Sequence, residues 1–500
     1  MRGGSGALRL VRPAAARVSF LLAIAARPVL AQAPPASPGA GADAVVAVVD
    51  GEILREADLD ARAREAAANL ESDLAQARRD ALAEEIRDRV LATEARRLGS
   101  TPNRLYLAEI LDRVPAPTSA QLAAEYDRRP EWRGQPLEDV RDEIAGDLLD
   151  RFEQERYSAW SRDREAAAGV QRRRDAAAPD LKPADVLAVV GREEVTSASL
   201  QERLAPKLYA RRSRAARLRA RAIDKAVTEK LLASAARRAG VSPEELLARE
   251  REARIRHPTE ADVRKVFESG GGQPSDFAAE RDAIAAMLEE YARQDAETAY
   301  FESLRKAATI EIRGNVRMPS PPALPVAGSG HPQKGGPRAS VTIVEFGDFE
   351  CGPCGAAHPM VADVLRAQGD KVRLIFRQFP LSRHPHARKA AEAALAADAQ
   401  GKFWPYADAL FADQRRLDEA SLGERARRLG LDTRSFDEDL HRRRFASDVV
   451  GEIREGRLYG VRWTPTFFID GVLFEPSADP DAFAKAVAAR VAETDRARKP

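Results

Sequence analysis

Cysteine is nearly absent from this chain: only two of its 500 residues are cysteines, Cys351 and Cys354. A structural zinc site takes about four protein ligands, and one cysteine pair does not supply them. An excess of one charge is also lacking, because 80 basic and 78 acidic residues leave a net charge of +2. Such a balance gives no electrostatic footprint for nucleic acid. Finally, no apolar run approaches the roughly 18–20 residues that a membrane-spanning helix needs.

The two cysteines form a Cys-Gly-Pro-Cys motif between a predicted strand and a predicted helix. Val341 to Phe346 is an apolar, β-branched run typical of a buried strand, and an Ala-rich segment suited to a helix follows Cys354. Residues three apart on a helix lie close enough for a disulfide. The N-terminus of the helix would stabilise a thiolate at Cys351. The motif predicts a redox pair; a structural disulfide is the alternative, although so short a loop restrains the unfolded chain little.

A second stretch favours the redox interpretation. Thr464-Pro465 is followed by an apolar strand, Thr466 to Ile469, and by an Asp-Gly turn. Proline is permitted at the start of a strand. A cis proline usually marks a tight, functional turn.

Together these stretches resemble the thioredoxin superfamily, and more closely its DsbA-like branch. The resemblance covers about Ser340 to Val491 and implies an α/β thioredoxin fold with a helical insertion, at 339–495. It also implies a protein thiol–disulfide oxidoreductase that needs neither a cofactor nor a metal. The matching segments are VEFGDFECGPC, FRQFPL from Phe376, HPHA from His384, GKFWPYADALF from Gly401 and TPTFFIDG from Thr464.

The resemblance assigns roles to five residues. Cys351 corresponds to the exposed nucleophile and Cys354 to the buried resolving thiol. Thr464 and Pro465 correspond to the cis-proline loop that faces them. Glu345 corresponds to a buried carboxylate that exchanges a proton with the second thiol, and burial in its apolar run would raise its pKa.

Two features depart from the DsbA-like pattern. Gly-Pro stands between the cysteines, as in thioredoxin, and Trp463 occupies a position where the branch often carries glycine. The direction of electron flow, whether oxidase, isomerase or reductase, therefore stays open. His384 and His386 have no carboxylate or cysteine at metal-ligand spacing, so we interpret them as loop and helix-start residues.

An internal repeat precedes this region. At a constant offset, Ala47 aligns with Ala188 and Gly99 with Gly240. Each copy begins with a short apolar strand, and long amphipathic helices follow. The pattern resembles the N-terminal chaperone module of SurA-type peptidyl-prolyl isomerases, without a segment like the parvulin catalytic domain. We therefore predict mainly α-helical modules at 44–168 and 184–313, and no isomerase activity.

The role of the modules stays open between two interpretations. They form either a cradle for unfolded polypeptide or a spacer and homodimerisation platform. The stretch 314–338 is crowded with proline and glycine, which predicts a semi-flexible linker to the last domain. The predicted fold class is thus multidomain: two mainly α-helical modules followed by an α/β domain.

The N-terminus has the features of a secretory signal at 1–33, with basic residues, a short apolar core from Val18 to Ala26, and small residues at Ala31 to Ala33. We therefore predict a periplasmic or otherwise exported protein. The expected partners are unfolded or cysteine-containing exported proteins and a membrane redox partner. The alternative function is a folding chaperone or assembly factor whose thioredoxin domain mainly binds.

Overall fold

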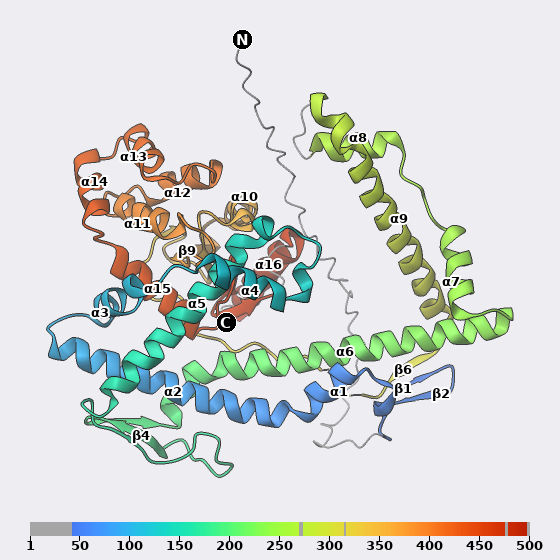
Figure 1. The fold of residues 1–500 in the computed structure, drawn as a ribbon, viewed down its shortest axis with the longest axis horizontal. Coiled ribbons are helices and arrows are strands. Elements are labelled where there is room, and N and C mark those ends of the chain that lie inside the picture. Colours follow the sequence, from blue (N-terminus) through green and yellow to red (C-terminus); the bar gives the residue numbers. More distant parts are fainter. Residues whose placement is uncertain (1–42, 270–273, 315–316, 476–478, 498–500) are drawn as a thin grey trace. The chain divides into compact units, whose positions relative to one another are not determined.

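The computed structural model describes residues 43–269, 274–314, 317–475 and 479–497. A mostly helical N-terminal region is followed by an α/β domain, which confirms the predicted multidomain fold class (Figure 1). The predicted signal at 1–33 lies outside the described residues. Within these ranges, no helix is both long and apolar enough to cross a membrane.

The chain divides into two compact units. The first unit comprises Met1–Asn69 and Ala215–Met318, and the second comprises Leu70–Arg214 and Pro319–Pro500. These units differ from the predicted sequential modules at 44–168 and 184–313. The physical reason is an exchange of strands, because in each unit a hairpin from one repeat covers helices of the other repeat.

In the first unit, the hairpin of repeat one packs on helices of repeat two. β1 pairs with β2 and also, antiparallel, with β6, so that Val48 lies opposite Glu311. Figure 1 shows the blue hairpin beside the yellow β6. Val46 and Leu54 share an apolar cluster with Val227. The elements are β1 (Val45–Val49), β2 (Glu52–Arg55), α1 (Ala61–Ala68), the later part of α6 (Gln201–Ala239), α7 (Pro243–Glu252), α8 (Glu260–Ser269), α9 (Phe277–Ala307) and β6 (Ile310–Ile312).

The second unit begins with the reciprocal arrangement. The hairpin β4–β5 of repeat two pairs with β3 of repeat one. Leu187 of β4 shares an apolar cluster with Val90 of α2 and Tyr157 of α5. The elements are α2 (Leu70–Arg97), α3 (Pro102–Glu109), α4 (Ser119–Arg128), α5 (Leu137–Glu165), β3 (Val170–Arg172), β4 (Val186–Val190) and β5 (Glu193–Thr196).

The α/β domain of the second unit is built on a five-stranded sheet in the order β11-β10-β8-β9-β7. β8 (Val341–Gly347) runs parallel to β9 (Val372–Gln378) and antiparallel to β10 (Thr466–Ile469). β10 continues antiparallel into β11 (Val472–Phe474). Most side chains of β8 and β9 are buried, as expected for a sheet covered on both faces.

Helices cover both faces of this sheet. Apolar side chains of α10 (Gly352–Gln368) and α16 (Pro480–Ala497) share one cluster with β8, and those of α11 and α15 share another. The helices α11 to α15 together form an insertion between β9 and β10, as predicted. The inserted helices are α11 (Ala387–Asp398), α12 (Phe403–Ala412), α13 (Glu419–Arg428), α14 (Thr433–His441) and α15 (Ala446–Leu458).

The segment predicted as a semi-flexible linker, 314–338, differs from that expectation over its described part. β7 (Gln333–Gly335) adds an edge strand beside β9, and Ala323 forms a bridge with Val472. Leu324 and Val326 are buried in the core of the α/β domain. Burial of these two apolar side chains stabilises the packing of the proline-rich segment on the sheet.

The helical part of the second unit packs closely on the α/β domain. A Cβ atom added to Gly146 of α5 would lie 2.6 Å from the Cβ of Arg383 and 2.7 Å from its backbone nitrogen. A Cβ atom added to Gly451 of α15 would lie 2.5 Å from the side chain of Asn103. Gly146 therefore allows a close approach of the backbone at Arg383, and Gly451 leaves room for the amide of Asn103.

Charged groups join the same two parts. Arg454 of α15 binds Asp88 of α2 at 2.9 Å, and Arg457 pairs with Glu153 of α5. Glu153 is buried and also accepts a hydrogen bond of 2.6 Å from Tyr106. Buried charges paired in this way restrict how the helices lie on the domain, because separating them would leave an uncompensated charge.

Candidate redox site

The two cysteines lie where β8 leads into α10. Cys351 is the N-terminal cap residue of α10, Pro353 lies in the first turn, and Cys354 follows it. The backbone N–H of Cys354 donates to the carbonyl of Cys351 at 3.0 Å. Both thiols are free and buried.

The burial of Cys351 differs from the predicted exposed nucleophile. Only 3% of the residue is exposed, and its Sγ, when protonated, donates to the carbonyl oxygen of Thr464 at 3.3 Å. The Thr464–Pro465 peptide bond is cis. The cis-proline loop therefore faces the cysteine, as predicted, and it also covers the thiol.

The environment separates the acidities of the two thiols. The hydrogen bond from Cys354 lowers the pKa of Cys351 to about 6, although burial opposes this effect. Burial raises the pKa of Cys354 well above its usual range, and the neighbouring Cys351 adds to that shift. At neutral pH, Cys351 is thus the thiolate that can act as a nucleophile, and Cys354 keeps its proton.

Glu345 lies in the middle of β8, opposite Phe467 of β10 and Phe376 of β9. It is fully buried, as its apolar run predicted. Burial raises its pKa to about 8, with a smaller contribution from the charge of Cys351. Its Oε1 has no hydrogen-bond partner among the described residues. A buried carboxyl group that titrates near neutral pH is suited to proton transfer.

Residues 329–489 match the family model Thioredoxin_4, described as Thioredoxin. The matched residues span the α/β domain, which therefore has a thioredoxin-like fold and is called the thioredoxin domain below. This match confirms the fold predicted for 339–495 and leaves the resemblance of the repeats to SurA a prediction.

Individual relatives match a similar share of the chain. A Na⁺/H⁺ antiporter NhaA 1 of Salinispora arenicola is 43% identical over 161 residues, which is 32% of this chain and 24% of that protein. The chain thus spans about a quarter of the length of that curated relative.

Solved structures match about a third of the chain. A thioredoxin-like oxidoreductase from Silicibacter pomeroyi DSS-3 has 29% identity and a TM-score of 0.31, covering 35% of this chain and 96% of that one. BdbD from Bacillus subtilis has 24% identity and a TM-score of 0.30, with the same coverages.

Asp348 is a residue of the thioredoxin domain's site that the sequence did not reveal. Its buried carboxylate accepts hydrogen bonds of 2.8 Å from the N–H groups of Glu350 and Leu381, and it contacts Nδ1 of His384 at 2.7 Å. Burial alone would lower the pKa of His384, but the bond to Asp348 outweighs it and the net pKa is raised. Asp348 therefore ties the cysteine loop to the turn after β9.

Gln414 holds the same loop from the helical insertion. Its Nε2 donates to the carbonyl oxygens of Phe349 at 3.0 Å and Cys351 at 2.8 Å. A Cβ atom at Gly355 would lie 2.2 Å from Oε1 of Gln414, so the small residue after Cys354 makes room for this amide. No local sequence pattern marks Gln414, because its partners lie far away in the chain.

Trp463 gives the thioredoxin domain an exposed ring next to the cis-proline loop. About half of the residue, 49%, is exposed, although Thr464 beside it is buried. His358 on α10 contacts Asp408 at 2.8 Å and packs on Phe411, which leaves it a partly exposed structural residue. Among the described residues, no group of three or more His, Cys, Asp or Glu side chains is arranged to hold a metal.

Proposed function

We propose that this protein is an exported thiol–disulfide oxidoreductase that acts on protein disulfides through Cys351 and Cys354. The observation that carries this proposal is the pairing of a thiol of lowered pKa with a buried, protonated thiol in the first turn of α10. The thioredoxin fold of the domain supports the reaction class.

The reaction is an exchange of disulfides. The Cys351 thiolate attacks one sulfur of a substrate disulfide, forms a mixed disulfide and releases the other substrate sulfur as a thiolate. Cys354 then loses its proton to Glu345 in its ionised form and attacks Sγ of Cys351. This step releases the second substrate thiolate and leaves an enzyme disulfide, so the substrate has gained two electrons. The same steps in reverse oxidise a substrate dithiol.

The cis-proline loop offers a place for an extended client segment. The backbone of Thr464 lies next to Cys351 and would pair with such a segment, as in strand addition. The exposed ring of Trp463 would add an apolar contact beside it.

The helical parts fit the interpretation as SurA-like modules that hold unfolded clients. Met287 and Tyr291 lie one turn apart on α9, and both are exposed. Exposed apolar side chains on one helix face favour contact with apolar client segments. An exported location rests on the signal features of 1–33, and we propose a membrane redox partner that resets the cysteines.

Reduction of insulin by the full-length protein, followed with dithiothreitol as electron donor, tests the catalytic proposal. Cys351→Ser should abolish the acceleration, and Cys354→Ser should accumulate a mixed disulfide with the client. If Cys351→Ser accelerates as the wild type does, the alternative stands, in which the thioredoxin domain of a chaperone mainly binds. Equilibration in glutathione buffers then gives the reduction potential, and with it the direction of electron flow.

A further inference from the structure

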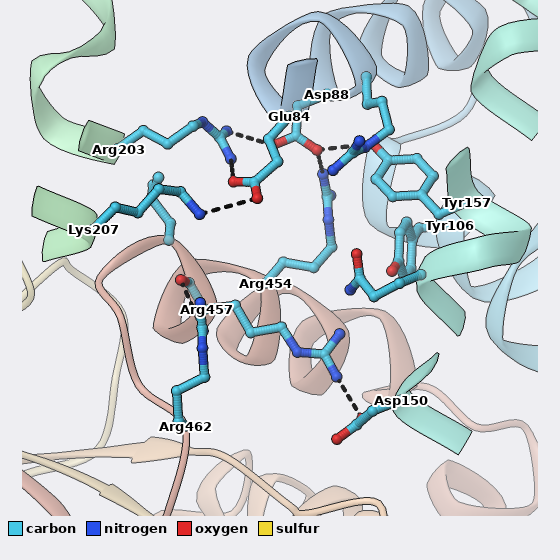
Figure 2. A pocket seen from close by; sticks show the side chains of 13 residues that line it. Glu84, Asp88, Tyr106, Asp150, Tyr157, Arg203, Lys207, Arg454, Arg457 and Arg462 are labelled. Carbon is cyan, nitrogen blue, oxygen red and sulfur yellow. Dashed lines mark hydrogen bonds and ion pairs between the residues drawn. The ribbon is translucent and has the colours of Figure 1, made fainter. Parts of the chain in front are cut away.

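A cavity of about 330 Å³ lies within the second unit, between its helical part and the thioredoxin domain (Figure 2). Side chains from α2, α3, α5, α6, α15 and the segment before the cis-proline loop line it. Three carboxylates face it, those of Glu84, Asp88 and Asp150. Six cationic side chains line it: Arg87, Arg203, Lys207, Arg454, Arg457 and Arg462.

Four of these cations have carboxylate partners. Arg203 binds Asp88 at 2.5 Å, and Lys207 binds Glu84 at 3.0 Å. Arg454 binds Asp88 as well, at 2.9 Å, and Arg457 binds Asp150 at 3.0 Å, in addition to Glu153. Figure 2 shows the pairs that involve Asp88, Glu84 and Asp150 along the wall of the cavity.

The other two cations, Arg87 and Arg462, have no ion pair within the part of the chain that the structure describes. The guanidinium group of Arg87 lies 5.8 Å from the ring centre of Tyr157, and its Nε is buried without a hydrogen-bond partner. Arg462 donates only to carbonyl oxygens, those of Val461 at 3.0 Å and Arg457 at 3.4 Å. Although Arg462 is exposed as a residue, desolvation of its guanidinium group at the cavity lowers its pKa, and the charge of Arg457 adds to this. Of the two, Arg87 carries the less well compensated charge, because its Nε is buried without a partner, whereas Arg462 is exposed as a residue.

We propose that this cavity binds a small oxyanion, a carboxylate or a phosphate, through Arg87 and Arg462. The planar guanidinium fork matches the oxygens of both anions and forms charge-assisted hydrogen bonds with them. A cavity of about 330 Å³ has room for such an anion with its water.

The two arginines come from different parts of the second unit. Arg87 belongs to α2 of the helical part, and Arg462 directly precedes Trp463 and Thr464 of the thioredoxin domain. An anion held by both would bridge the two parts. An anion that contacts both arginines would bind only when the two parts are docked, and it would therefore stabilise the docked arrangement.

Calorimetric titration of the full-length protein with sodium phosphate and, separately, with sodium succinate at constant ionic strength tests this proposal. We expect saturable binding of at least one anion at one site per chain, with a rise in the melting temperature. Binding of phosphate alone or of succinate alone identifies the class of anion. Arg87→Gln and Arg462→Gln should each weaken binding about tenfold or more, which corresponds to about 1.4 kcal/mol.

Arg97→Gln is the matched control. Arg97 lies on α2 as Arg87 does, but it pairs with Glu94 at the surface and does not line the cavity. This variant should bind as the wild type does, and so should Cys351→Ser, because the site is separate from the thiol chemistry. Should Arg87→Gln fail to fold by circular dichroism, the exposed Arg462 decides alone. The proposal is overturned by the absence of saturable binding of either anion up to about 10 mM, or by equal weakening in Arg97→Gln.

Discussion

The Sγ atom of Cys351 lies 3.3 Å from the carbonyl oxygen of Thr464, a residue 113 positions later in the chain. Through this contact the loop before β10 covers the thiol that the redox reaction needs. A substrate sulfur reaches Cys351 only when it takes over the space next to Thr464. The reactivity of this thiol therefore measures both its pKa and the opening of the loop.

The first prediction concerns this reactivity. The rate at which iodoacetamide alkylates Cys351 in the reduced protein should rise with pH, with a midpoint at about 6, because the hydrogen bond from Cys354 lowers the pKa of Cys351. Cys354 should stay unmodified while the protein is folded, since burial raises its pKa. Peptide mass spectrometry at a series of pH values measures both. In urea the two thiols should react alike, and equal labelling of the folded protein would refute the assigned roles.

The second prediction concerns Glu345. Its pKa is raised from 4.5 to about 8 in the folded state, so folding favours the protonated carboxyl group. The contribution of Glu345 to the free energy of unfolding is therefore complete below pH 4.5 and is lost as the pH rises to about 8. Glu345→Gln should therefore gain stability relative to the wild type over this range, by up to roughly 5 kcal/mol. The gain is measured by urea unfolding of both reduced proteins at about pH 5 and pH 9.

The comparison of Glu345→Gln with the wild type isolates the carboxyl group. The lowered pKa of Cys351 acts in the opposite sense, since its contribution grows as the pH rises above about 6, but it is present in both proteins. Glu438→Gln, at an exposed position on α14, serves as the control and should show no such trend. A stability difference that is independent of pH would contradict the titration of Glu345 in this window.

The third prediction tests how the helical part lies on the thioredoxin domain. Gly146→Leu should cost about 1–3 kcal/mol of stability, because the new side chain would overlap the backbone of Arg383. Hydrogen exchange of the amide of Leu381, which donates to Asp348, should become faster. Glu143→Leu adds the same side chain at an exposed position of α5 and should change neither quantity. Equal effects of both substitutions would show that α5 does not dock in this way.

The fourth prediction concerns client binding at Trp463. Trp463→Ala should raise the KM for an unfolded protein client that contains a disulfide about tenfold, with dithiothreitol as electron donor, which corresponds to a lost contact of about 1.4 kcal/mol. Turnover of hydroxyethyl disulfide, which has no apolar segment to contact the ring, should stay the same. Trp463→Tyr should restore most of the affinity. Equal losses with both substrates would assign Trp463 a structural role instead.

The residues at the centre of the site were predictable because they lie in local motifs. The residues that support it through long-range contacts were not predictable. The Cys-Gly-Pro-Cys motif at Cys351 to Cys354 and the Thr464-Pro465 segment are short, and the chemistry of their residue types was enough to predict their roles. Asp348 and Gln414 act on the loop through partners far along the chain. A single sequence contains no signal for such pairs.

The arrangement of the repeats was unpredictable for a different reason. The two copies have the same pattern of a short strand and long helices, so a hairpin fits the helices of its own copy or those of the other copy. The pattern therefore does not distinguish pairing within one copy from exchange between the copies. The described part of 314–338 shows a related limit: its proline and glycine content predicted flexibility, whereas two apolar residues, Leu324 and Val326, fix it on the sheet.

The pairing of Val48 with Glu311 also determines when the first unit can fold. After the β1–β2 hairpin, which ends at Arg55, has been synthesised, about half of the chain must follow before β6, which begins at Ile310, can pair with it. Contacts of such high sequence separation slow folding, because the loop must close before they form. During that interval one edge of β1 stays open to pairing with other chains. The first unit thus stays incompletely folded during synthesis, in the same state as the clients on which the protein is proposed to act. This predicts that the protein depends on general chaperones during its biogenesis.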